Sequence, residues 1–286
     1  MKKITSMIIS LLLIGGLVTC EMATQQEESD GETGLLSVLL TDAPFPIDMV
    51  SAAEVSIDSV VIRHTGESED GPPFITLSTE SETYNLLTLQ NGVTATLAEL
   101  EVPTGEYDLV RLYVEKASIT LKNGSSYDVF VPSGKQTGIK LFIDPPISVQ
   151  SDLTAELLLD LDVSKSFILR GNLHTPAGIN GFNFKPVIRA TNLSTAGRIT
   201  GTVMDSTGSP VTDTTQVWAA QDTVVSNTFT DSTGAYTLIG LPEGMYTVGA
   251  IIHDDTVSIS GVEVNAGNAT ELNILWENSI GKMVAN

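Results

Sequence analysis

Two aspartates in one short segment are the acids best placed to act together. Asp160 and Asp162 alternate with leucines, so in an extended strand both carboxylates lie on one face and the leucines on the other. By the same alternation, three basic side chains face away from their apolar neighbours: Lys140, Lys185 and Arg189. We predict that these bases neutralise Asp160 and Asp162 in one structural charge cluster. The rival interpretation is a calcium site on the two aspartates, although nearby cations would compete with the metal.

The sequence offers no clear catalytic constellation. Nucleophilic catalysis needs a serine or cysteine with a base beside it. The three histidines, His64, His174 and His253, have neither nucleophile-elbow nor zinc-ligand spacing, so we interpret them as solvated loop residues. The prediction is a protein that is not an enzyme and has no cofactor, with calcium as the alternative. A metal-assisted hydrolase would need convergent acids and a histidine in one cleft.

Two aromatic residues are candidates for a ligand platform. Val217 and Ala219 flank Trp218, so Trp218 points outward if its neighbours face a core, and Phe229 could do the same on the next strand. Such a pair could stack on a sugar ring. The alternatives are that a partner domain covers the pair or that Trp218 belongs to the core.

The first twenty residues are typical of an export signal. Two lysines precede an apolar run that is too short to span a bilayer, and the run ends at Cys20. No disulfide can form within the chain, because Cys20 is its only cysteine. The arrangement resembles a bacterial lipobox. We therefore expect removal of residues 1–19 and a lipid on Cys20 that holds the protein on a membrane. The rival is an ordinary secretory signal with a chance cysteine.

The charge of the chain limits its partners. Without the signal, 12 of the 14 basic residues and all 35 acidic residues remain, a formal charge of −23. Such a surface repels nucleic acid and anionic headgroups, so we exclude a nucleic-acid partner. Cations, neutral glycans and basic proteins remain. Residues 20–33 are acidic and poor in apolar side chains, and we expect a disordered tether there.

Period-two alternation from Gly34 onward predicts an all-β chain of two β-sandwich domains. A polar break separates residues 34–193 from residues 197–277, and the second set has the size and strand number of a small immunoglobulin-like domain. Residues 278–286 are expected to be a loose tail. Strand candidates include residues 84–89, 107–115, 117–121, 139–143, 182–190 and 269–275, with a turn at Pro145-Pro146.

The two predicted domains share one short pattern. Pro103-Thr104-Gly105-Glu106-Tyr107 and Pro242-Glu243-Gly244-Met245-Tyr246 each lead into a strand. Proline fixes φ and glycine supplies a positive φ at a tight corner. We predict that each tyrosine starts the returning strand with its ring inward and its hydroxyl towards the backbone.

The first predicted domain resembles the envelope-lipoprotein family catalogued as domain of unknown function 4382. The matching pieces are LTDAP at 40–44, NLLTL at 85–89, PTGEY at 103–107, VPSGKQTGIKL at 131–141, LDLDVSKSFIL at 159–169 and KPVIR at 185–189. Their number and order make the resemblance specific. It implies an envelope location and leaves the function open.

The second predicted domain resembles carboxypeptidase regulatory-like domains, through GRITGTVMDSTGSPV at 197–211, TDSTGAY at 230–236 and GLPEGMYTV at 240–248. The resemblance implies a seven-stranded, prealbumin-like sandwich without catalytic activity and related to carbohydrate-binding modules. We expect a lipid-anchored protein of the cell envelope, on the outer membrane and either periplasmic or surface-exposed. The favoured role is extracellular binding, with carbohydrate as the ligand class. The rival is a structural or adhesin-like subunit that binds another envelope protein.

Overall fold

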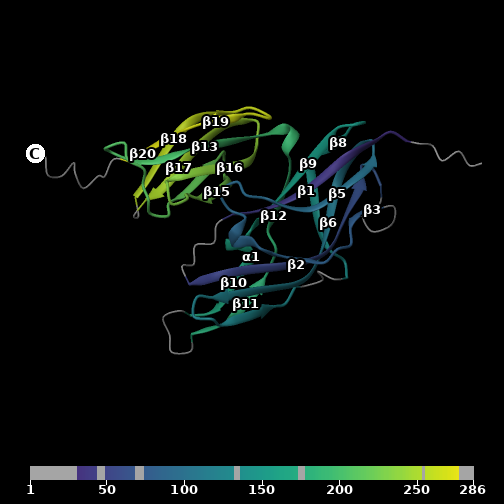
Figure 1. The fold of residues 1–286 in the computed structure, drawn as a ribbon, viewed down its shortest axis with the longest axis horizontal. Helices are drawn as coiled ribbons and strands as arrows, with labels where there is room; N and C mark the ends of the chain where they lie inside the picture. Colours follow the sequence, from purple (N-terminus) through teal and green to yellow (C-terminus); the bar gives the residue numbers. More distant parts are fainter. Residues whose placement is uncertain are drawn as a thin grey trace, which may run out of the picture. The chain divides into compact units, whose positions relative to one another are not determined.

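A computed structural model describes residues 31–43, 49–67, 74–131, 136–172, 178–252 and 255–276 (Figure 1). The predictions for Cys20, His174, His253 and the two chain ends lie outside these residues. The described chain is almost entirely β-strand, which confirms the predicted all-β class. Its longest α-helix is the single turn α1, Val163–Ser166, and no helix in the described ranges is long and apolar enough to cross a bilayer.

The first sandwich contains a four-stranded sheet. Its strands, in spatial order, are β12 (Ile188–Asn192), β9 (Thr154–Asp162), β1 (Thr33–Ala43) and β5 (Ala95–Pro103). β1 runs parallel to β9 and antiparallel to β5. β1 therefore lies inside the sheet, and β5 forms one of its two edges.

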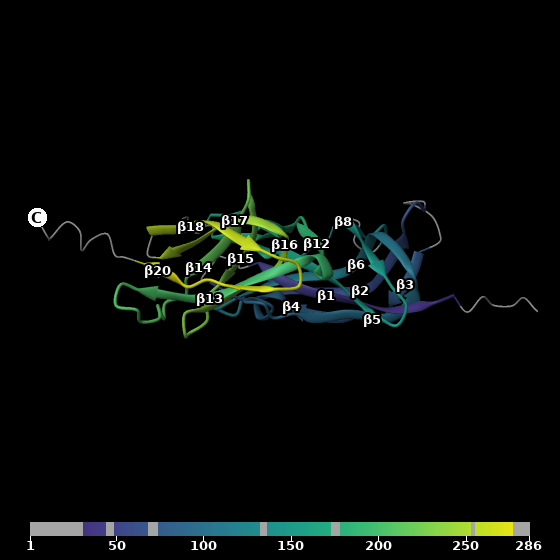
Figure 2. The same cartoon turned by 90° about the horizontal axis from the view of Figure 1, so that it is seen from above.

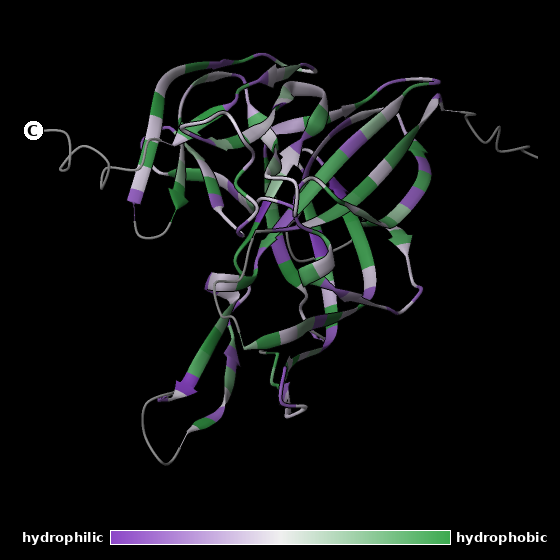
Figure 3. Ribbon diagram, turned by 60° about the vertical axis from the view of Figure 1, so that its left-hand side comes forward, coloured by the Kyte–Doolittle hydropathy of each residue, from purple (hydrophilic) through white to green (hydrophobic). Residues whose placement is uncertain are grey.

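A six-stranded sheet completes the first sandwich. Its strands are β3 (Phe74–Ser78), β2 (Val50–His64), β6 (Gly105–Leu121) and β7 (Ser126–Val129), with β4 (Glu82–Asn85) paired to β2 and β8 (Ile139–Val149) paired to β6. Both sheets contribute to one hydrophobic core, in which Leu36, Ile62 and Leu157 are fully buried. This core forms because apolar and polar residues alternate along the strands, which Figure 3 shows as alternating green and purple bands. β10 (Phe167–Gly171) and β11 (Ile179–Phe184) form a separate two-stranded sheet.

Several predicted strand limits in this domain are wrong. β5 was not predicted at all, residues 107–115 and 117–121 form the single strand β6, and β8 continues through the predicted turn at Pro145-Pro146. Residues 84–89 end in the 3-10 turn η1, Leu86–Thr88, and residues 182–190 divide between β11 and β12. β5 escaped prediction because a register shift opposite Val38 and Leu39 places two consecutive apolar residues, Leu97 and Ala98, in buried positions.

The second sandwich has two four-stranded sheets and its own core (Figure 2). One sheet contains β16 (Ala235–Pro242), β13 (Ala196–Asp205), β19 (Ala269–Glu271) and β20 (Ile274–Trp276). The other contains β15 (Val224–Phe229), β14 (Gln216–Ala220), β17 (Gly244–Ile252) and β18 (Asp255–Val264). The predicted strand 269–275 is in fact two short strands, β19 and β20, both parallel to β13.

The predicted tyrosine corner is confirmed in both sandwiches. The Tyr107 hydroxyl donates to the Pro103 carbonyl at 2.8 Å, and the Tyr246 hydroxyl donates to the Pro242 carbonyl at 2.7 Å. Both rings are buried. Gly105 and Gly244 have φ of 145° and 152°, which side-chain-bearing residues rarely adopt.

The described residues from Glu32 onward form one compact unit, and a turn of the first sandwich binds the second. Asn91 follows η1 with φ of 58°. Its backbone N–H donates to Thr228 Oγ1 at 2.9 Å, its Nδ2 donates to the Ala235 carbonyl at 3.3 Å, and its Oδ1 accepts from the Thr237 N–H at 2.6 Å. One asparagine thus makes three hydrogen bonds between the two cores.

Candidate functional site

A groove lies where β14, β15 and β17 of the second sandwich meet the α1 turn of the first. Its volume is about 320 Å³, and we call it the junction groove. Its lining residues are Asp162, Ser164, Lys165, Gln216, Trp218, Val224, Asn227 and Ile251. The lining combines one aromatic and two exposed aliphatic side chains with five polar ones, a composition suited to a ligand that is partly apolar and partly hydrogen-bonding.

Trp218 points away from its own core, as the alternation predicts. Val217 and Ala219 are fully buried, whereas Trp218 is half-buried. Its indole lies over Gly249, the cross-strand partner of Trp218 on β17, and occupies the space that a side chain at Gly249 would need. Glycine at this position therefore lets the large ring lie against the sheet and line the groove.

Phe229 lies on the same face of the sheet as Trp218 but outside the groove lining. It pairs with Gln216, while Trp218 pairs with Asn227, so the two aromatic residues are diagonal neighbours. Phe229 is half-buried. Trp218 therefore lines the groove, and Phe229 lies next to it without contributing to the lining.

Asp162 forms the floor of the groove next to α1. It is the N-cap of that turn, with Oδ1 accepting from the Lys165 N–H at 3.0 Å and from Ser164 Oγ at 2.6 Å. Its Oδ2 lies 2.7 Å from Lys165 Nζ. The Lys165 side chain is 61% exposed, so its ammonium can also reach a ligand in the groove.

Asp160 belongs to a smaller pocket of about 170 Å³, which shares four lining residues with the junction groove: Asp162, Lys165, Val224 and Asn227. It pairs across β9 and β12 with Arg189, whose guanidinium nitrogen is 3.0 Å from Asp160 Oδ2. Arg189 also donates to the Gly240 carbonyl of the second sandwich at 2.6 Å. Burial raises the pKa of Asp160, and the charge of Arg189 opposes that shift.

The predicted five-residue cluster is wrong in its membership. Lys140 lies on β8 opposite Arg111. This strand belongs to the six-stranded sheet, whereas Asp160 and Asp162 lie in the four-stranded one, so Lys140 was assigned to the wrong sheet. Lys185 is exposed between β11 and β12, where its N–H donates to the Ser166 carbonyl. The base beside Asp162 is Lys165, three residues away, and an N-cap followed by a lysine at that spacing was the signal that could have identified it.

Asp42 is a third acid at this place, and the alternation gave no sign of it. It is almost fully buried at the end of β1, and its Oδ1 accepts from the Val163 N–H at 3.2 Å. Its Oδ2 makes no well-formed hydrogen bond within the described residues, although the Gln90 side chain lies near the carboxylate and opposes the rise of its pKa. Burial raises the pKa of Asp42 well above its usual value, and the charges of Asp160 and Asp162 add to the shift.

The remaining predicted sites can be placed briefly. Within the described ranges, no group of three or more His, Cys, Asp or Glu side chains is arranged to hold a metal ion. His64 lies at the end of β2, and its ring makes an edge contact with Tyr107 at 5.2 Å between centroids, so its side chain is not simply solvated.

Comparison with known families decides the relationship of the chain. Residues 33–186, more than half of it, match the model described as Domain of unknown function (DUF4382). The chain belongs to that family. Residues 198–277 match the carboxypeptidase regulatory-like domain, so the DUF4382 domain is followed by a second, prealbumin-like one, as the resemblances implied. No curated protein matches the sequence.

Pieces of the DUF4382 pattern that are far apart in sequence meet at the junction. Asp42, Asp160, Asp162 and Lys165 lie within the matched residues 33–186, and Arg189 follows them closely. Strand pairing brings them together, because β9 lies between β1 and β12. The residues that carry the family resemblance therefore also line or support the junction groove.

Solved structures give only remote similarity. The Bacillus anthracis TIE protein shares 15% identity over 86% of this chain, with a TM-score of 0.24, and the chain spans 34% of its length. Shaft pilin SpaA from Lactobacillus rhamnosus GG shares 10% identity over 86% of this chain and 97% of its own, with a TM-score of 0.25. BcpA, the major pilin subunit of Bacillus cereus, shares 12% identity over 85% of this chain and 70% of its own, with a TM-score of 0.23. Scores this low carry no information about function.

Proposed function

We propose that this chain is a non-catalytic binding protein of the bacterial cell envelope and that the junction groove binds a carbohydrate. The lipid on Cys20 is part of this proposal and rests on the sequence; mass spectrometry of the membrane-bound protein would detect the fatty acid. The observation that supports the groove is the combination of Trp218 with five polar side chains in one lining.

The chemistry of the lining suits a sugar better than an ion or a nucleotide. The indole offers an apolar face for the C–H groups of a pyranose ring. Gln216 and Asn227 can donate and accept hydrogen bonds with hydroxyl groups, and Asp162 with Lys165 offers one acceptor and one donor. Because Asp162 and Lys165 neutralise each other, the site does not require a charged ligand.

Among the described residues, the groove lining does not contain the parts of a hydrolase. Its acid Asp162 is engaged by a cation and by the N-terminus of α1, and no histidine is among its lining residues. These features support binding without turnover.

A glycan array on the mature protein tests the proposal, with Trp218→Ala, Trp218→Phe and Phe229→Ala alongside. We expect Trp218→Ala to weaken binding about fivefold, since loss of a stacked ring costs on the order of 1 kcal/mol. Trp218→Phe should retain part of the affinity. Phe229→Ala is the matched aromatic control outside the groove and should bind as the wild type does.

Two results would contradict this assignment. Unchanged binding by Trp218→Ala, with an unchanged melting temperature, would remove the junction groove as the site. Silence of the wild-type protein across the array would favour the second candidate, a structural or adhesin-like subunit. That second candidate draws support from the exposed edge of β5, described next.

A further inference from the structure

A second groove lies between the edges of the two sheets of the first sandwich. It has a volume of about 470 Å³ and is lined by residues 76–80, Glu82 and residues 96–100. β5 is the outermost strand of the four-stranded sheet, and β3 is the outermost strand of the six-stranded sheet. We call this site the edge groove.

The backbone of β5 presents unused pairing groups to the edge groove. The Leu35 N–H donates to the Leu153 carbonyl on the β9 side of β1. The backbone N–H and C=O of the next residue, Leu36, therefore point to the other side, towards its partner Leu100 on β5. Leu100 therefore turns its N–H and C=O towards β1, while Glu99 and Glu101 turn theirs outward. Within the described residues, β1 is the one strand that pairs with β5.

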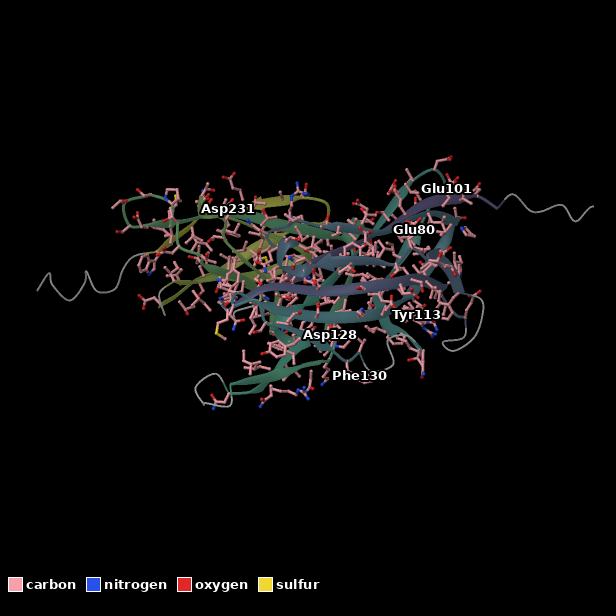
Figure 4. All side chains as sticks on the ribbon, turned by 60° about the horizontal axis from the view of Figure 1, so that its bottom comes forward. Glu80, Glu101, Tyr113, Asp128, Phe130 and Asp231 are labelled. Carbon is pink, nitrogen blue, oxygen red and sulfur yellow. The ribbon has the colours of Figure 1, made fainter. Side chains whose placement is uncertain are left out.

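The side chains of the edge groove combine an apolar floor with acidic walls. Leu77, Leu97 and Ala98 are buried at its floor, and Leu100 is 37% exposed. Glu80, Glu82 and Glu99 supply three carboxylates, and the lining contains no lysine, arginine or histidine. Figure 4 shows Glu80 and Glu101 projecting from this end of the sandwich.

Acidic residues on an edge strand also prevent strands of like charge from pairing. That role accounts for Glu99 and Glu101, and it disfavours a second copy of this acidic chain as the occupant. It does not account for a groove of this volume with leucines on its floor. An extended segment with apolar residues towards the floor and basic residues towards the glutamates would satisfy both the backbone groups and the charges.

We infer that the edge groove binds an extended, basic segment of a partner protein, which pairs with β5 as an added strand. The pairing supplies affinity through backbone hydrogen bonds, and the glutamates select for lysine or arginine. This interaction surface is independent of the carbohydrate proposal, because it shares no residue with the junction groove.

The test measures binding of two labelled peptides by fluorescence anisotropy at low and moderate salt. One peptide alternates lysine with valine, and the other alternates glutamate with valine. We expect only the lysine peptide to bind. Glu99→Lys should weaken binding at least about tenfold, since a like charge then faces the guest. Glu263→Lys, an exposed change on β18 with the same effect on net charge, is the matched control and should bind within about twofold of wild type.

A second variant tests the strand pairing itself. Glu99→Pro removes an N–H that points out of the sheet, so it should abolish peptide binding while the β1–β5 pairing persists. If that variant fails to fold, Glu99→Lys still decides the matter. Equal binding of both peptides, or equal loss in Glu99→Lys and Glu263→Lys, would overturn the proposal. Concentration-dependent dimers abolished by Glu99→Pro would also overturn it, in favour of a second copy.

Discussion

At the scale of single residues, the junction depends on how buried charge is compensated. Asp160 and Asp162 each have a basic partner within 3.0 Å. Asp42 forms no ion pair with a base within the described chain, and one of its oxygens is buried without a well-formed hydrogen bond. An unsatisfied buried polar group costs about 1 to 3 kcal/mol. Asp42 is therefore the position where the electrostatics of this site oppose folding.

We expect Asp42→Asn to change the pH dependence of stability. Because the pKa of Asp42 is higher in the folded state than its ordinary value of 3.8, folding favours the protonated acid. Wild-type stability from this group is present below about pH 4 and is lost as the pH rises through the folded pKa. Asparagine keeps an acceptor for the Val163 N–H but carries no charge. As the pH rises, the free energy of unfolding of the variant should increase relative to that of the wild type, by about 1 to 3 kcal/mol at most.

Urea unfolding of both proteins at several pH values between 4 and 9 measures this effect. Asp231→Asn serves as the control at an exposed turn, where hydrogen bonds from Thr233 and Ala235 lower the pKa of Asp231. That control should lose stability relative to wild type at neutral pH. A free-energy difference between Asp42→Asn and wild type that stays constant across the range would contradict the prediction.

At the scale of elements, each sandwich is fixed by a corner at which one strand turns back. The corner tyrosine is buried, and its hydroxyl holds the carbonyl of the proline four residues earlier. That bond satisfies a backbone carbonyl at a position where the chain leaves its regular pairing. The corner therefore stabilises the approach of the returning strand.

Removal of either corner hydroxyl should lower stability. Tyr107→Phe and Tyr246→Phe each lose one hydrogen bond to a backbone carbonyl, and we expect a loss of about 0.5 to 1.5 kcal/mol for each. Tyr113→Phe is the control, because Tyr113 is half-buried and no hydrogen bond of its hydroxyl is described. Denaturant unfolding measures all three. A loss for Tyr107→Phe no larger than that for Tyr113→Phe would show that the corner bond contributes nothing.

Alternation predicted the elements where it was unbroken and failed where it was not. Within β14 the alternation is unbroken, and the outward direction of Trp218 followed from its neighbours. β5 was missed because the register shift buries Leu97 and Ala98 together. The site was only partly predictable, because Asp42 reaches Val163 across 121 residues and nothing local in the sequence marks that contact.

At the scale of the whole described chain, the two cores are joined by few polar contacts. Asn91 supplies three hydrogen bonds to the second sandwich, and Arg189 supplies one to Gly240. Asn91 suits this role because asparagine tolerates the left-handed backbone conformation better than most residues. The junction groove lies beside these contacts, so its geometry depends on them.

Asn91→Gly should loosen the coupling of the two sandwiches without straining the turn. Glycine accepts the same φ but loses both side-chain hydrogen bonds, a loss of about 1 to 3 kcal/mol in total. In differential scanning calorimetry we expect a lower melting temperature, and separate transitions in place of a shared one. Asn123→Gly, in an exposed turn with a local bond to Ser125, is the control. Identical thermograms for Asn91→Gly and wild type would contradict the coupling.

The interior position of β1 has a mechanical consequence. β1 pairs with β5 from Thr33 to Leu40 and with β9 from Leu35 to Ala43. A force that arrives at Thr33 along the strand must shear both ladders at once, since no single row of hydrogen bonds can open ahead of the other. The pairing of β1 on both sides therefore suits the fold to tension applied at Thr33, the end that the proposed lipid on Cys20 would load.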